Sequence, residues 1–233
     1  NGLLVKETEL VRQKWLDNYF YGQLLSAQYV YGKPQVTLAG GWTVYDGNHH
    51  GDVIWAKYGF DNGFRYYDVD ALKSDINVYG KWQYQLSNHL YGFADLQYRR
   101  VQHKMDGFAD NPSLHIDRRF NFVNPKAGLT YQQNGWQAFL SYALANKEPN
   151  RDDFEASLSN QPRQETLHDF EAGIEKKGNR YQASATLYYM RYKDQLVLTG
   201  MINDVGAYTR INVPKGYRAG IELQGGYQFS KKL

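Results

Sequence analysis

Hydrophobic and polar residues alternate along most of this chain. Between Tyr181 and Tyr189 every second residue is apolar, and the positions between them carry Gln, Ser, Thr and Tyr. A period of two predicts β-strands that present two unlike faces. Over the whole chain, the alternation predicts nine strands in the ranges 14–30, 35–45, 74–86, 90–102, 119–131, 136–146, 164–177, 180–194 and 208–229.

Two segments depart from this pattern. Residues 7–18 are the one stretch with the composition of an amphipathic helix, and we interpret them as a loop that runs into the first strand. In the fifth strand, Phe120 and Phe122 lie in one phase, whereas Val123 and later apolar residues lie in the other. Because Pro125 lies at this change and cannot donate a ladder hydrogen bond, we predict a bulge or kink there.

The connections between the predicted strands alternate strictly between short and long. The short turns are 31–34, 87–89, 132–135 and 176–179, and the long links are roughly 46–73, 103–118, 147–163 and 195–207. This order predicts an antiparallel up-and-down meander whose two ends differ. Transmembrane β-barrels of bacterial outer membranes have this property, with tight turns on one side and large loops on the other.

Aromatic residues gather near both ends of the predicted strands. The middles of the strands carry mostly Ala, Leu, Val, Ile and Gly. Near the short turns lie Trp82, Tyr84, Tyr131, Trp136, Tyr181, Tyr227 and Phe229, and towards the long links lie Tyr98, Tyr142 and Tyr189. Two aromatic girdles around an apolar band are typical of a lipid-facing surface. The charged opposite face then predicts a watery lumen, or a surface against a polar plug.

Composition argues against several classes of protein, namely helical membrane proteins, nucleic-acid-binding proteins and proteins that depend on Cys. The chain has 233 residues and 21 Tyr, and its mean hydropathy of -0.68 excludes a helical membrane span but not a barrel. A net charge of +3 gives no support for nucleic-acid binding. The absence of Cys excludes disulfides, Cys-ligated zinc and thiol chemistry.

The strand count predicts an incomplete barrel. Nine is an odd number, whereas single-chain bacterial barrels have an even number of strands. An open sheet edge in hydrocarbon leaves backbone groups unpaired, at a cost of several kcal/mol each. We therefore expect one domain, residues 1–233, whose closing strands lie on another segment or chain.

Seven stretches carry a family likeness, in order and over nearly the whole chain. They are KWLDNYFYG (14–22), VIWAKY (53–58), YGFADLQYR (91–99), FNFVNPKAGLTYQ (120–132), NKEPNRDDF (146–154), LYYMRYKDQLVLTGMINDVGAY (187–208) and INVPKGYRAGIEL (211–223). These stretches resemble TonB-dependent outer-membrane receptors, particularly those of Bacteroidetes type.

The resemblance implies a barrel of about 22 strands around an N-terminal plug. It also implies TonB-driven uptake of a scarce chelate such as cobalamin, a ferric siderophore or haem. Within NKEPNRDDF, the residues Glu148, Pro149, Asn150 and Arg151 match a family stretch at the mouth of a strand. No plug domain, TonB-box segment or final strand with a terminal aromatic occurs, so we expect a middle-to-late piece of the barrel.

Loop 53–68 is the strongest candidate for substrate contact. Its candidate residues are Trp55, Tyr58, Arg65, Tyr66 and Tyr67. Aromatic rings suit stacking on a planar or macrocyclic ligand, and an Arg suits a carboxylate or phosphate. The alternative is a loop that packs on itself or on a neighbouring loop.

Other candidates lie at the mouth and in the lumen. Asn150 and Arg151 either contact substrate or plug, or form a loop-initiating turn with its own ion pairs. Arg99, Arg218 and Glu222 would help to line the route. His49 and His50 are weak metal candidates, because adjacent residues of an extended chain point to opposite sides.

The sequence supports no enzyme, no resident cofactor and no metal site. It contains no serine elbow, phosphate loop or HExxH helix. Our first hypothesis is the barrel portion of a TonB-dependent transporter in the Gram-negative outer membrane. Its partners would be lipid, the remaining strands, the plug, TonB and a small-molecule chelate. The alternatives are a plug-free pore or adhesin barrel and a soluble β-domain with ligand-binding loops.

Overall fold

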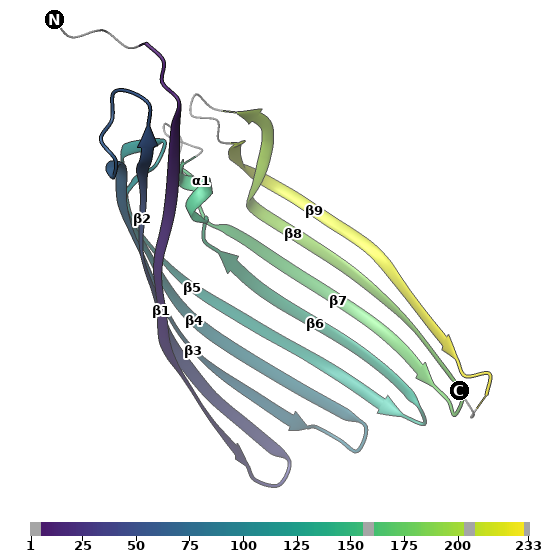
Figure 1. The fold of residues 1–233 in the computed structure, drawn as a ribbon. Coiled ribbons are helices and arrows are strands. Elements are labelled where there is room, and N and C mark those ends of the chain that lie inside the picture. Colours follow the sequence, from purple (N-terminus) through teal and green to yellow (C-terminus); the bar gives the residue numbers. More distant parts are fainter. Residues whose placement is uncertain (1–5, 156–160, 203–207, 231–233) are drawn as a thin grey trace, which may run out of the picture.

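The computed structural model describes residues 6–155, 161–202 and 208–230. Figure 1 shows strands β1 to β9 and one short helix, α1. Their bounds are β1 Leu10–Val30, β2 Pro34–Ala56, β3 Phe64–Gln85, β4 Leu90–Phe108, β5 Asn111–Gln133, β6 Trp136–Lys147, α1 Arg151–Glu155, β7 Glu165–Lys177, β8 Tyr181–Ile202 and β9 Tyr208–Tyr227. Within these described ranges, no helix is long and apolar enough to cross a membrane.

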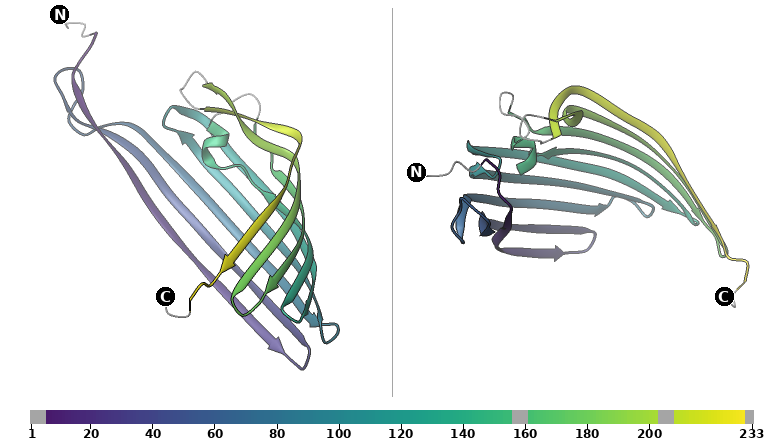
Figure 2. Two further views of the ribbon diagram at one scale, coloured as in Figure 1. Left: turned by 90° about the vertical axis from the view of Figure 1, so that its right-hand side faces the viewer. Right: turned by 45° about the horizontal axis from the view of Figure 1, so that its top comes forward.

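The strands form one curved antiparallel sheet in sequence order, β1 to β9 (Figures 1 and 2). Each strand pairs with the next one along the chain, and in the described ranges β1 does not pair with β9. The nine predicted strands and the up-and-down meander are therefore confirmed. Within the described residues the sheet has no second layer against it, as a soluble sandwich would require.

Most of the predicted long links are extensions of the strands. β2 continues to Ala56 and β3 begins at Phe64, so the predicted link 46–73 reduces to residues 57–63. β4 and β5 likewise continue to a turn at 109–110. In these extensions the outer face carries polar residues such as Lys104 and Asp117, whereas apolar residues such as Met105 lie on the inner face. The outward apolar alternation therefore stops there, and the pattern alone placed the strand ends too early. We call the end with these long hairpins the mouth.

The predicted bulge at Pro125 does not occur in the pairing of β5 with β4. Pro125 lies opposite Leu96 without a register shift. The pairing of β5 with β6, however, ends at Lys126, opposite Ala143. The prediction was wrong because the change of phase marks two different faces of one regular strand. Phe122 is buried on one face, whereas Val123 is exposed on the other.

The outer face of the sheet carries the apolar alternate residues. Large side chains on it are exposed, among them Trp82 at 43%, Leu140 at 60% and Leu187 at 53%. Nothing in the described part of the chain covers them, which is what a lipid-facing surface requires. The inner face carries charged residues, including Lys81, Asp95 and others that pair across β3, β4 and β5.

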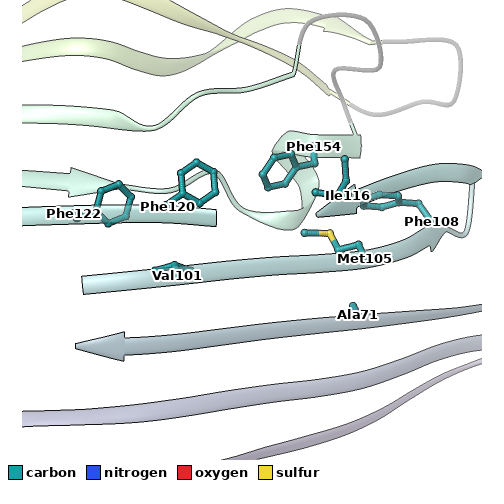
Figure 3. Close-up of a cluster of buried hydrophobic side chains, with 8 residues drawn as sticks. All are labelled: Ala71, Val101, Met105, Phe108, Ile116, Phe120, Phe122 and Phe154. Carbon is teal, nitrogen blue, oxygen red and sulfur yellow. The ribbon is translucent and has the colours of Figure 1, made fainter. Parts of the chain in front are cut away.

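The inner face near the mouth differs from the expected watery surface. A core of buried side chains lies there over β3, β4, β5 and α1 (Figure 3). Its members are Ala71, Val101, Met105, Phe108, Ile116, Phe120, Phe122 and Phe154. Phe154 of α1 is completely buried. The sequence pattern missed this core because it depends on a loop helix that folds back onto the inner face.

Candidate functional site

Several of the predicted site residues meet on the inner face at the mouth. His49 of β2 lies on the inner face, and its Nε2 is 3.0 Å from the hydroxyl of Tyr45. Burial, and then the positive charge of Arg151, lower the pKa of His49. The neutral imidazole and the phenol therefore form a polar pair beside a cation.

Tyr66 and Tyr67 of β3 pack edge-to-face, with ring centroids 5.1 Å apart. Both rings lie over Gly51, where any side chain would clash with them. A register shift between Gly51 and Asp52 brings the two rings together. Burial raises the pKa of Tyr67, while the charge of Arg151 acts in the opposite direction.

Arg151 lies close enough for its positive charge to act on both His49 and Tyr67. Its guanidinium lies 4.6 Å from the centre of the Phe108 ring, and its Nε is buried without a hydrogen-bond partner. We call Tyr45, His49, Tyr66, Tyr67 and Arg151 the mouth cluster. It offers three phenols, two of them in contact, together with an imidazole and a cation. Such a set suits an anionic or aromatic ligand.

Asn150 has a structural partner. Its backbone N–H donates to Asp153 at 2.7 Å, and its side-chain oxygen accepts from the backbone N–H of Asp153 at 2.9 Å. This reciprocal arrangement caps the first turn of α1. Arg210 of β9 also donates to the Asp153 carboxylate. Because Arg210 lies in β9, this ion pair ties the turn to a distant strand.

Glu148 anchors the same segment to β3 and β4. It is 7% exposed and accepts hydrogen bonds from Lys73 at 2.9 Å and from both terminal nitrogens of Arg99 at 2.8 and 2.9 Å. Burial favours a higher pKa for Glu148, but Lys73, its own backbone amide and Arg99 outweigh it and lower the pKa to about 2. Arg99 also donates to Asp75, so its guanidinium bonds two carboxylates of the barrel wall.

The remaining predicted residues lie apart from the mouth cluster. Trp55 and Tyr58 are exposed near the tip of the β2–β3 hairpin. Arg65 pairs with Asp52 at 3.0 Å and with Asp68 at 2.9 Å, which raises its pKa. Both ion pairs lie within the β2–β3 hairpin, so the Arg65 guanidinium already has two carboxylate partners there.

His50 and the lumen residues also lie elsewhere. His50 faces the opposite side from His49, where it bonds Asn48 and stacks on Trp15. Arg218 of β9 lies over the ring of Tyr192 at 5.4 Å, lower on the inner face, and Glu222 follows on the same face of β9. Within the described residues, no three His, Cys, Asp or Glu side chains converge to hold a metal ion.

The sequence reasoning missed several partners that define the site. These partners come from four separate elements, β2, β3, α1 and β9, and they are Tyr45, Lys73, Asp75, Asp153 and Arg210. Each is an ordinary polar residue in its own stretch, so no local motif marks it. The strand register would have placed Lys73 and Asp75 on the face of Arg99, because directly paired residues share a face.

Comparison with known proteins gives a family for the chain. The family model for the TonB dependent receptor-like β-barrel matches residues 6–233. A search of curated proteins returned no match.

Solved structures share the fold at low identity. They include a copper transporter, OprC, with a TM-score of 0.79 and 14% identity over 94% of this chain and 36% of that one. The alcaligin outer-membrane receptor FauA from Bordetella pertussis has a TM-score of 0.61 and 18% identity over 94% and 37%. The ferric-catecholate import receptor Fiu from E. coli K12 has a TM-score of 0.62 and 13% identity over 94% and 36%. This chain therefore spans little more than a third of each.

Proposed function

Because the chain belongs to the TonB-dependent receptor β-barrel family, we propose that it forms part of the wall of a receptor that binds a metal chelate. Members of this family are outer-membrane barrels, so the mouth faces the outside of a Gram-negative cell. The observation that carries the proposal is the family match over residues 6–233. A ferric siderophore is the first candidate ligand, and haem and cobalamin are the others.

The chemistry of the mouth cluster supports an anionic, ring-bearing ligand. Arg151 supplies a fixed positive charge, and its buried Nε has no partner. Tyr67 supplies an aromatic surface, and His49 supplies a neutral imidazole. Ferric chelates of catecholate or carboxylate type carry negative charge and planar groups, which Arg and Tyr recognise well.

The exposed hairpin tip is the place of first contact in this proposal. Trp55 and Tyr58 are 46% and 57% exposed, so both rings are accessible to an approaching ligand. Further along the route, Arg218 and Glu222 line the lumen below the mouth. The plug and TonB act through segments outside this chain.

Ligand binding to the intact polypeptide tests the proposal. Purified outer-membrane vesicles are titrated with a ferric catecholate, a ferric hydroxycarboxylate, haem and cobalamin, and intrinsic Trp fluorescence is recorded. We expect one class to bind, and Arg151→Gln to weaken it roughly tenfold or more through loss of a charge-assisted contact. The matched control is Arg119→Gln, because Arg119 lies on the outer face of β5, opposite Gln102, and its loss should leave affinity unchanged.

The alternative is a plug-free pore or an adhesin barrel. It predicts that none of the four chelate classes binds, and that vesicles containing the intact polypeptide pass small solutes without TonB. Saturable chelate binding that depends on Arg151, in closed vesicles, would exclude this alternative.

A further inference from the structure

The sheet splits at the mouth between β5 and β6. Below the split the two strands pair regularly from Gln133 with Trp136 up to Lys126 with Ala143. Above it, β5 pairs only with β4 as far as Asn111, and β6 pairs only with β7 as far as Lys147. The mouth wall therefore consists of two halves, β1–β5 and β6–β9, without a backbone ladder between them.

The segment Asn146–Glu155 crosses this split. At its start, the backbone N–H and side chain of Asn146 donate to Asn124 of β5 at 3.1 and 2.9 Å, and Thr166 of β7 donates to Asn146 at 2.8 Å. These hydrogen bonds link β5, β6 and β7 just beyond the last backbone pair between β5 and β6.

The same segment holds the first half of the wall through buried groups. Glu148 receives hydrogen bonds from Lys73 of β3 and Arg99 of β4. Phe154 is completely buried in the core that β4 and β5 form (Figure 3). A short exposed loop does not normally bury an acid and an aromatic ring in succession.

The segment holds the second half through Asp153. Its carboxylate is 5% exposed and pairs with Arg210 of β9. One segment thus contacts β3, β4 and β5 on one side and β9 on the other. Because these strands are far apart in the sheet order, the segment must lie across the concave side, where Figure 1 places α1.

We propose that Asn146–Glu155 is a brace that joins the two halves of the mouth, and that Glu148 is the residue that positions it. Arg151 is part of this brace, so its place beside His49 and Tyr67 depends on the anchors on either side of it. The brace sets the width of the mouth, and, resting on the proposed function, it also sets the affinity for the chelate.

Distance measurements across the split test the brace without any ligand. These 233 residues contain no Cys, so within them spin labels attach only at Ser113→Cys near the β4–β5 turn and at Lys215→Cys on β9. The intact polypeptide is labelled in outer-membrane vesicles and studied by pulsed electron spin resonance. We expect Glu148→Gln and Asp153→Asn each to widen and broaden the distance distribution relative to the unsubstituted brace.

The matched control is Asp152→Asn, one residue away on the same helix turn. Asp152 is exposed, and the same carboxylate-to-amide change there should leave the distribution unchanged. An unchanged distribution in both Glu148→Gln and Asp153→Asn, with the protein folded, overturns the proposal. So does an equal widening in Asp152→Asn.

A second measurement covers variants that fold poorly. A disulfide between Asn124→Cys and Asn146→Cys spans the split where the two side chains are in contact. We expect it to form readily when Glu148 and Asp153 are unsubstituted and several-fold more slowly with Asp153→Asn. Equal rates with and without the brace contradict the proposal.

Chelate affinity separates the brace from the proposed function. If the receptor function holds, Glu148→Gln and Asp153→Asn should weaken binding several-fold, although neither contacts the ligand. A widened mouth in a protein that binds no chelate upholds the brace and rejects the proposed function. If both variants keep the unsubstituted mouth width and the protein binds chelate, the proposed function is upheld and the brace is rejected.

Discussion

His103 is the clearest case of a residue whose chemistry comes from its surroundings. It lies on the inner face of β4, five residues beyond the girdle residue Tyr98, and is 4% exposed. The rings of Phe120 and Phe154 lie 6.4 and 5.8 Å away. Burial, followed by the charge of Lys73, lowers the pKa of His103 to about 4.

This lowered pKa predicts acid sensitivity. The unfolded chain binds a proton at His103 below about pH 6.5, whereas the folded protein resists it until about pH 4. Stability should therefore be complete above pH 6.5 and fall as the pH decreases towards 4. Since one pKa unit corresponds to about 1.4 kcal/mol, we expect a loss of about 2–3 kcal/mol in the free energy of unfolding.

Urea unfolding of the intact polypeptide between pH 4 and 7.5 measures this loss. His103→Gln should flatten the profile, because the variant carries no titrating group at this position. Phe120→Leu serves as the control, since it weakens the same core without removing the imidazole and should lower the whole curve while keeping its slope. A wild-type profile that is flat over this range contradicts the prediction.

At the scale of elements, β5 is the strand at which the sheet of the mouth divides into two halves. Its pairing with β4 runs through Pro125 without a register shift, but its pairing with β6 ends at Lys126. Asn124 replaces the missing ladder bond with its side chain, which accepts from the backbone N–H of Asn146 and donates to Gln97. One amide side chain thus connects β4, β5 and β6.

Amide hydrogen exchange can measure this replacement. Asn124→Ala removes the acceptor, and a hydrogen bond of about 1 kcal/mol corresponds to a roughly fivefold rise in exchange at Asn146. Gln132→Ala is the matched control, because Gln132 bonds Gln137 across the same two strands where the backbone ladder is intact. Faster exchange in both variants would show that the effect is not specific to the split.

For the whole molecule, adjacent residues of a strand face different media, because one side chain points to the outer face of the sheet and the next to the inner face. Leu140 lies on the outer face in the apolar band, and Ser141 beside it lies on the inner face between Gly128 and Glu171. Leu140→Arg should destabilise the folded protein in a bilayer by about 2–4 kcal/mol, since it places a charge in hydrocarbon. Ser141→Arg should change stability by about 0.5 kcal/mol or less.

Reversible unfolding from lipid vesicles compares these two variants directly. Neighbouring positions have nearly the same strand propensity and depth, so the difference between them reports the medium on each side. Equal losses at Leu140 and Ser141 would mean that both faces meet water, and the membrane assignment would then be wrong.

Much of the architecture could be predicted, and part of the site could not. The alternation in residues such as Tyr181 and Leu187 gave the nine strands and their faces. The strand end at Ala56 could not be found, because residues 53–56 are all apolar and no alternation marks a strand there. The role of Arg151 in the site stays a prediction, and its charge acts on His49 and Tyr67 only because folding brings the three residues near one another.

The sequence by itself determined the medium of each face and the order of the strands, because side-chain alternation and turn length are local properties. Only the tertiary structure decided which residues meet at the mouth. Glu148 is bonded by Lys73, 75 positions earlier, and Asp153 by Arg210, 57 positions later. Such contacts depend on the register of the whole sheet and its curvature, and no single stretch of sequence records either.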